Sequence, residues 1–210
     1  MTILKTSIRG ESEILTSMIQ SQETGENSVE DLLKPETSLE KGILMAPEIL
    51  KGLDWGTPRF GHPEGKVLFH VKEVLDNIDK LDIDTSKRQK LRLIAIVHDT
   101  FKNLEDKSKE RDWSKHHSIL ARQFMEKFID DKTILDIIEL HDEAYYSWRM
   151  IKLYNQEIAG RKRLHNLLAR LGDNLQLYFL FFKCDTQTGD KIQAPLKWFE
   201  QVIASTEVYS

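Results

Sequence analysis

The stretch Leu91-Arg92-Leu93-Ile94-Ala95-Ile96-Val97-His98-Asp99 decides how this chain folds. Its apolar residues continue a helical pattern that starts at the capping cluster Asp84-Thr85-Ser86, so we expect a buried helix that ends at Val97. A histidine and an aspartate then follow side by side. Burying such groups without a partner costs on the order of several kcal/mol, and a divalent cation suits both imidazole nitrogen and carboxylate oxygen.

Polar residues of the same kind flank other apolar helices in the sequence. His70 lies beside the apolar stripe of a helix expected over 67–78, and His141-Asp142 follows an apolar helix that Asp131 can cap. Asp185 lies near the end of a third apolar stretch. Because these residues come from distant parts of the chain, we expect a fold that gathers helices around one centre. A divalent ion bound there would keep net positive charge, which polarises phosphoryl oxygens and lowers the pKa of water.

The remaining pattern is helical too. A leucine stripe over 164–171 stops at Gly172, Asp173 is expected to cap a helix over 174–186, and a last helix should follow Pro195. We find no repeat and no strand alternation. The sequence therefore predicts an all-α, single-domain helical bundle over residues 41–210. Residues 1–40 form a polar, partly mobile segment with short helical turns expected at 13–19 and 29–33.

Composition limits the function classes. The chain has 210 residues, 40% of them hydrophobic, which suffices for one core, and its net charge of −4 demands neither nucleic acid nor a membrane. A phosphorylated substrate stays possible through a local cationic patch. The single Cys184 excludes an intramolecular disulfide. The longest apolar run, Leu175–Phe182, is far shorter than the roughly 20 residues that span a bilayer. With no signal-peptide pattern at the N-terminus, we expect a cytoplasmic protein of open oligomeric state.

The order His70, His98-Asp99 and Asp185 resembles the HD superfamily of metal-dependent phosphohydrolases. More closely, residues 61–191 are similar to the HD domain of bacterial CCA-adding tRNA nucleotidyltransferases. The segments that carry this likeness are His62-Pro63-Glu64-Gly65 with His70 eight residues after His62, Ile94–Lys102, His116–Ala121, Leu140-His141-Asp142 and Cys184–Asp190. The nucleotidyltransferase domain has no counterpart, so CCA addition itself is not expected. What the likeness implies is an all-α HD-type fold and phosphoester hydrolysis.

The resemblance also implies roles for single residues. It assigns the first metal to His70, His98, Asp99 and Asp185. His117 and His141 match histidines that hold a second metal or bind phosphate in some members. Lys102 matches a phosphate-contacting lysine, although Phe101 stands where the family has glycine. Asp99 and Lys102 are thus the expected catalytic residues, and the expected cofactor is one or two ions of Mg, Mn, Co, Ni or Fe.

Several alternatives stay open. Asp173 competes with Asp185 for the distant ligand position, and His116 competes with His117; we favour the second of each pair. Besides Lys102 and His117, the substrate phosphate is expected to meet Arg149 or the cluster Arg161-Lys162-Arg163.

The expected reaction is that of a phosphomonoesterase or a 2′,3′-cyclic phosphodiesterase acting on a nucleotide or an RNA-end phosphate, so the expected partner is a small phosphorylated substrate or an RNA end. An HD-fold di-iron oxygenase is the second hypothesis, because it uses the same types of ligand. A regulatory or interaction protein without enzymatic activity is the third.

Overall fold

The computed structural model describes residues 28–105 and 112–207, so the helical turn expected at 13–19 lies outside it. Within these ranges the protein is all-α, as predicted. No strand occurs there, and the β-type pairing is limited to one isolated bridge between Arg59 and His62. The chain divides into two compact units at Leu44 and Met45. The boundary that we place after residue 40 stays a prediction.

The described part of the first unit consists of two short helices, α2 (Val29–Leu33) and α3 (Ser38–Leu44). Helix α2 lies where the sequence predicts a helical turn. It begins with a capping box in which the Ser28 hydroxyl accepts from the Asp31 backbone amide while the Asp31 carboxylate accepts from that of Ser28. It ends at Lys34, which adopts the left-handed conformation.

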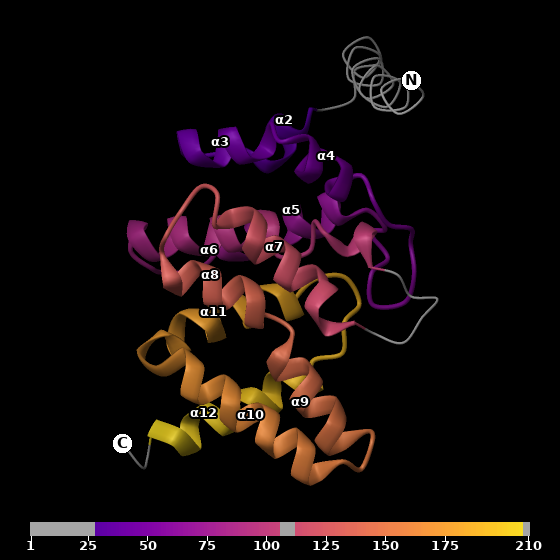
Figure 1. Cartoon of the computed structure of the whole chain (residues 1–210), viewed down its shortest axis with the longest axis vertical. Coiled ribbons are helices and arrows are strands. Elements are labelled where there is room, and N and C mark those ends of the chain that lie inside the picture. Colours follow the sequence, from indigo (N-terminus) through magenta and orange to yellow (C-terminus); the bar gives the residue numbers. More distant parts are fainter. Residues whose placement is uncertain (1–27, 106–111, 208–210) are drawn as a thin grey trace, which may run out of the picture. The chain divides into compact units, whose positions relative to one another are not determined.

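Helix α6 (Thr85–Val97) forms the core of the second unit (Figure 1). The Asp84 carboxylate caps it by accepting from the Lys87 amide at 2.9 Å, as the sequence predicts. Its last two turns, Leu91–Val97, are fully buried. Three helices pack around it: α5 (Val67–Ile78), α8 (Lys132–Leu140) and α11 (Leu175–Thr186).

The other elements of this unit surround these four helices. Helix α7 packs against α8, α9 packs against α10, and α12 packs against α9 and α11. Their bounds are α4 Pro47–Leu53, η1 Lys102–Leu104, η2 Trp113–Lys115, α7 His117–Met125, α9 Glu143–Lys152, α10 Glu157–Leu171, η3 Gly172–Asn174 and α12 Ala194–Glu207. The expected cap Asp173 instead lies inside η3, and Asn174 is the residue that precedes α11. None of the helices in the described ranges combines the length and the apolar character needed to cross a bilayer.

The candidate metal ligands lie at or near the ends of helices. Helices α6 and α8 stop immediately before His98 and His141, while α7 begins at His117. His70 lies in the first turns of α5, and Asp185 lies in the last turn of α11. Because α5, α8 and α11 all pack on α6, these termini meet at one end of the core.

Candidate metal centre and its cavity

The first group of polar side chains comes from α5, α6 and α11. We call it cluster 1: His70, His98, Asp185 and the Oδ2 atom of Asp99. The Nε2 atom of His70 lies 2.9 Å from Asp185 Oδ1, 3.3 Å from His98 Nε2 and 3.6 Å from Asp99 Oδ2. His98 Nε2 in turn lies 3.5 Å from Asp99 Oδ2 and 3.8 Å from Asp185 Oδ1. Two nitrogens and two oxygens therefore converge.

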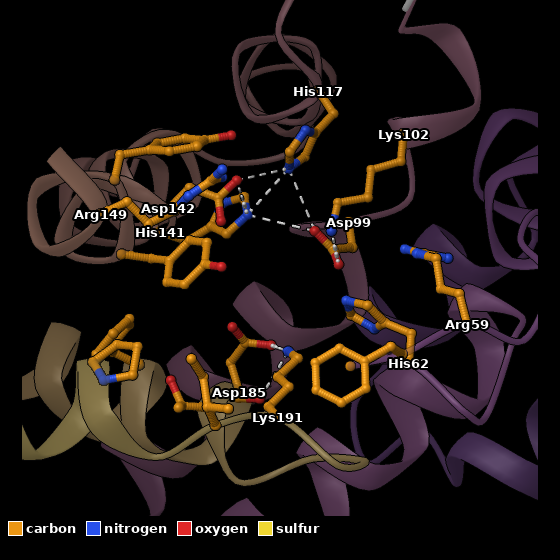
Figure 2. A pocket seen from close by; sticks show the side chains of 18 of the residues that line it. Arg59, His62, Asp99, Lys102, His117, His141, Asp142, Arg149, Asp185 and Lys191 are labelled. Carbon is orange, nitrogen blue, oxygen red and sulfur yellow. Dashed lines mark hydrogen bonds and ion pairs between the residues drawn. The ribbon is translucent and has the colours of Figure 1, made fainter. Parts of the chain in front are cut away.

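A second group mirrors the first. We call it cluster 2: His117, His141, Asp142 and the Oδ1 atom of Asp99. The Nε2 atoms of His117 and His141 lie 3.2 Å apart, and each is 3.4 Å from Asp99 Oδ1. Asp142 Oδ2 lies 3.5 Å from His117 Nε2 and 3.6 Å from His141 Nε2. Figure 2 shows Asp99, His117, His141 and Asp142 pointing toward one another. Asp99 thus presents one carboxylate oxygen to each cluster.

Backbone contacts fix the orientation of two imidazoles. His98 Nδ1 donates to the Ala95 carbonyl at 2.9 Å, and His141 Nδ1 donates to the Ile138 carbonyl at 2.8 Å. A carbonyl oxygen only accepts, so the Nδ1 atoms carry the protons. Whenever such a ring is neutral, its Nε2 atom therefore turns a lone pair into its cluster. This arrangement is the usual preparation of a histidine for metal binding.

Carboxylates lie beside the Nδ1 atoms of the other two imidazoles. Glu105 Oε1 lies 2.6 Å from His117 Nδ1, and it also accepts from the His117 amide at 3.1 Å. Glu64 Oε1 lies 2.9 Å from His62 Nδ1 and 3.5 Å from His70 Nδ1. Glu105 therefore acts as an outer partner that holds the Nε2 atom of His117 toward cluster 2. Glu64 bonds to His62 and lies beside His70, whose Nδ1 atom has no hydrogen-bond partner among the described residues.

The pKa values of the two backbone-tied histidines move in opposite directions. Burial lowers the pKa of His98 to about 3, so this ring is neutral at pH 7. Burial also acts to lower the pKa of His141, but the charges of Asp142 and Asp99 outweigh it and raise the pKa to about 9. In the absence of a metal ion, His141 therefore carries a proton that His98 lacks.

The carboxyl groups of both clusters are ionised. Burial by itself raises the pKa of Asp99, but His98 and Lys102 hold it well below its usual range. Burial opposes ionisation of Asp185 as well, and Lys191 and His70 together hold its pKa well below the usual range. The pKa of Asp142 is lowered, against burial, by His141 and His117. A cation can therefore bind these carboxylates without displacing a proton from them.

The donor set fits a divalent metal. Each cluster offers two imidazole nitrogens and two carboxylate oxygens, which suits first-row divalent ions. The buried Asp99 Oδ1 atom has no hydrogen-bond partner among the described residues, which is a costly arrangement unless a cation or a proton lies beside it. The candidate ligand atoms of His70, His98 and Asp99 lie within 4.8 Å of one another, and so do those of Asp99, His117 and His141. The residues present can therefore hold one ion in each cluster.

Two lysines accompany the carboxylates. Lys102 Nζ lies 2.5 Å from Asp99 Oδ2, and the nearby carboxylates, Asp99 foremost, raise the pKa of Lys102 against the effect of burial. Lys191 Nζ lies 2.9 Å from Asp185 Oδ1 and 3.0 Å from the Asp185 carbonyl. Both ammonium groups are thus paired with a metal-ligand candidate.

A cavity of about 370 Å³ opens over the clusters (Figure 2). Its lining combines the polar centre with cations and with aromatic and apolar side chains. The cationic and aromatic part of the lining comprises Arg59, Phe60, His62, Lys102, Tyr145, Tyr146, Arg149, Phe182 and Lys191. Arg149 packs over the rings of Tyr145 and Tyr154 and donates to the Tyr154 hydroxyl. The cavity can thus accept an anion beside an apolar group.

The structure brings together every predicted ligand: His70, His98, Asp99, His117, His141 and Asp185. Lys102 and Arg149 line the same cavity. Asp173, the alternative to Asp185, is exposed in η3. His116, the alternative to His117, instead caps α7 and bonds to Ser118 and Tyr146.

The cluster Arg161-Lys162-Arg163 does not line this cavity. Arg163 forms an ion pair with Glu143 at 2.5 Å and lies over the rings of Trp113 and Tyr146, and Arg161 pairs with Glu157 on the surface of α10. Of the cationic groups considered for the phosphate, Lys102 and Arg149 therefore remain.

Sequence reasoning missed four contributors: Asp142, Glu105, Glu64 and Lys191. For Asp142 a signal existed, since His141-Asp142 repeats the pair His98-Asp99 at the end of an apolar helix. Glu64 stands in the His-Pro-Glu motif, which was noted without a role for the glutamate. Nothing in the local sequence marks Glu105 or Lys191, because their roles depend on how loops approach the clusters.

Among the comparisons with known proteins, only the one with protein families gives a match. The family described as "HD domain" matches residues 67–171, half of the chain. The matched interval includes His70, His98-Asp99, His117 and His141-Asp142, whereas Asp185 lies beyond it. No curated protein and no solved structure matches the chain.

Proposed function

This chain belongs to the HD domain family, and we propose that it is a metal-dependent phosphohydrolase. The family consists mostly of metal-dependent hydrolases. In finer terms, we propose a phosphomonoesterase or a 2′,3′-cyclic phosphodiesterase that acts on a nucleotide or an RNA-end phosphate. The likeness of residues 61–191 to the HD domain of bacterial CCA-adding enzymes is the reason to include RNA ends. A cytoplasmic location stays a prediction.

The observation that supports this proposal most strongly is the shared carboxylate. Asp99 faces two imidazole nitrogens through Oδ2 and two more through Oδ1, each at 3.4–3.6 Å. Sites that hold two ions on either side of one group are typical of phosphoester hydrolysis. When bound, divalent ions supply water of lowered pKa and offset charge on the phosphoryl oxygens.

The chain's own residues would position the phosphoryl group. Lys102 holds Asp99 Oδ2 and brings a positive charge to the cavity beside the clusters. Arg149 lines the same cavity and forms no ion pair with a carboxylate among the described residues, so its guanidinium is available to a phosphoryl oxygen. His117 also lines the cavity and is held by Glu105, so it can contact the phosphate from a fixed direction.

The substrate class draws support from the cavity wall. Tyr145, Tyr146 and Phe182 bring aromatic surface next to the cationic groups. A nucleotide presents both an anion and an aromatic ring, and its size suits a cavity of about 370 Å³.

The purified chain should be assayed with Mn²⁺, Mg²⁺, Co²⁺ or Ni²⁺ against nucleoside 2′-, 3′- and 5′-monophosphates, 2′,3′-cyclic nucleotides and p-nitrophenyl phosphate. We expect hydrolysis that stops in EDTA. Lys102→Ala should lower kcat by about 10²–10³-fold while metal content stays constant, because it removes charge stabilisation. Lys197→Ala, an exposed lysine of α12, is the control. Failure of every metal and ester pair would contradict the proposal.

A di-iron oxygenase is the second candidate, since the same two sets of imidazole and carboxylate donors suit iron. Iron content after expression and oxygen consumption by the reduced protein separate the two. If iron alone is retained and oxygen is consumed without phosphoester turnover, the oxygenase replaces the hydrolase.

A further inference from the structure

A tight turn at the cavity edge presents Arg59 and Phe60. The Arg59 amide donates to the His62 carbonyl at 3.0 Å, and the His62 amide donates to the Arg59 carbonyl at 2.8 Å. Gly61 within this turn has φ of +81°, which favours glycine. The Gly61 amide also donates to Asp190 Oδ1 at 2.6 Å, so the turn is anchored to the loop after α11. Arg59 and Phe60 therefore project from a fixed backbone.

The charge of Arg59 is not neutralised by any carboxylate among the described residues. Its side chain donates only to the Thr57 carbonyl, at 3.4 Å. The two lysines of the cavity differ in this respect, because Lys102 is paired with Asp99 and Lys191 with Asp185. Arg59 therefore keeps most of its five donors for a ligand.

Phe60 is the most exposed aromatic ring of the cavity wall. It is 82% exposed although it lines the same cavity as the metal centre. An exposed aromatic ring at the edge of a cavity offers its flat face to a ligand. A planar base is a suitable cover, because every nucleobase offers a face that stacks on an aromatic side chain.

Arg59 and Arg149 lie on opposite sides of the ligand residues (Figure 2). A substrate whose scissile phosphoryl group contacts the clusters on the Arg149 side can therefore extend to Arg59. We propose that Arg59 and Phe60 form a subsite for a nucleotide that carries a second phosphoryl group. The guanidinium binds this second group, and the Phe60 ring stacks on the base. The subsite rests on the proposed function, since that function places the scissile group at the clusters.

Guanidinium geometry and cavity size favour this ligand. The planar donor fork of arginine matches two phosphoryl oxygens at once. The volume of about 370 Å³ lies near the lower end of small-molecule cavities, so one nucleotide unit fills it. A ribose with a phosphoryl group on either side is such a unit, whether free or at the end of an RNA chain.

Isothermal titration in EDTA tests the subsite without turnover. The probes are adenosine 3′,5′-bisphosphate and adenosine 5′-monophosphate, and the variants are Arg59→Ala, Phe60→Ala and the control Arg161→Ala, an exposed arginine of α10. We expect Arg59→Ala to weaken bisphosphate binding by about tenfold or more, because charge-assisted bonds are lost, and to leave monophosphate binding within about twofold. Phe60→Ala should weaken both probes by about fivefold or more. The control should change neither.

Equal losses for both probes in Arg59→Ala, or no loss for either, would overturn the subsite. A trinucleotide ending in the same bisphosphate distinguishes the sources: tighter binding indicates an RNA end, and equal binding indicates a free nucleotide. The titration tests whether Arg59 and Phe60 bind the nucleotide, and this test does not depend on whether the protein hydrolyses esters. If Arg59 selects the bisphosphate while no phosphoester is turned over with any metal, the proposed function fails and the subsite stands.

Discussion

Cluster 1 and cluster 2 contain the same kinds of donor and share Asp99, yet they differ in how they are prepared for a cation. Cluster 1 contains His98, whose pKa of about 3 leaves it neutral at pH 7. Cluster 2 contains His141, whose pKa of about 9 keeps it protonated there. The difference arises from neighbouring charge. For His141, the charges of Asp142 and Asp99 outweigh burial. His98 also has carboxylates nearby, Asp99 at 3.5 Å and Asp185 at 3.8 Å, but burial together with the charges of His141 and His70 outweighs them.

This comparison shows that donor type alone does not define a metal site. In cluster 1 an ion can bind without displacing a proton from His98. In cluster 2 the ion must replace the proton of His141. We therefore expect metal binding to cluster 2 to strengthen as pH rises, and metal binding to cluster 1 to lack any such contribution from His98.

The largest effect is expected at the shared residue. Asp99→Ala removes one oxygen from each cluster, so both ions should be lost and phosphoester turnover should disappear. The loss of metal affinity should exceed the roughly 10–100-fold that follows removal of an outer partner. Metal analysis and circular dichroism measure the result, and Asp76→Ala, on the exposed side of α5, is the control. If Asp99→Ala retains one tight ion, the carboxylate does not join the clusters.

Substitutions outside the shared residue should separate the clusters. Asp185→Ala should empty cluster 1, and Asp142→Ala should empty cluster 2, so each variant is expected to bind one ion in place of two. Equilibrium dialysis against Mn²⁺ gives the stoichiometry. Loss of both ions in each variant would show that the clusters act as one site.

The pH dependence should also differ between the clusters. From about pH 6.5 to 9, binding to cluster 2 releases the His141 proton, so its affinity should rise about tenfold per pH unit. His98 is neutral over this whole range and adds no such dependence to cluster 1. Calorimetric Mn²⁺ titrations at pH 6.5, 7.5 and 8.5 measure both affinities. Parallel slopes for the two sites would contradict the assignment of the proton to His141.

A smaller effect is expected from a substitution in α4, which should lower the stability of the fold and disturb both clusters at once. A Cβ atom at Gly52 in α4 would lie 1.7 Å from the carbonyl oxygen of Thr100, the residue after Asp99. Gly52→Ala should therefore lower the free energy of unfolding by about 1–3 kcal/mol and lower the affinity of both clusters for their ions. Gly42→Ala is the matched control, because its Cβ would meet nothing within 4 Å and alanine favours the helix by about 0.5–1 kcal/mol. Urea unfolding compares the two, and equal stabilities would contradict the close approach of α4.

Much of cluster 1 could be predicted from the sequence. His70, His98 and Asp185 interrupt or end apolar helices, so their burial follows from periodicity, and burial requires a partner. Asp142 stands in an equally visible pair with His141. The tight packing of α4 against Thr100 could not be predicted, because the short helix Pro47–Leu53 gives no periodic signal that names its neighbour.

The orienting and substrate-facing groups depend on tertiary structure. Glu105 meets His117 across twelve residues of chain, and the turn that carries Arg59 is anchored by the bond from the Gly61 amide to Asp190, which lies 129 residues away. Such contacts leave no local pattern in the sequence. The opposite pKa shifts of His98 and His141 were likewise out of reach, since both histidines end apolar helices in the same way.

Anomalous diffraction from crystals grown with Mn²⁺ tests the shared-carboxylate centre most directly. We expect two manganese peaks, one within bonding distance of Asp99 Oδ2 and the nitrogens of His70 and His98, and one beside Asp99 Oδ1 and the nitrogens of His117 and His141. Manganese bound elsewhere, or no peak near either oxygen of Asp99, would contradict the two-cluster centre.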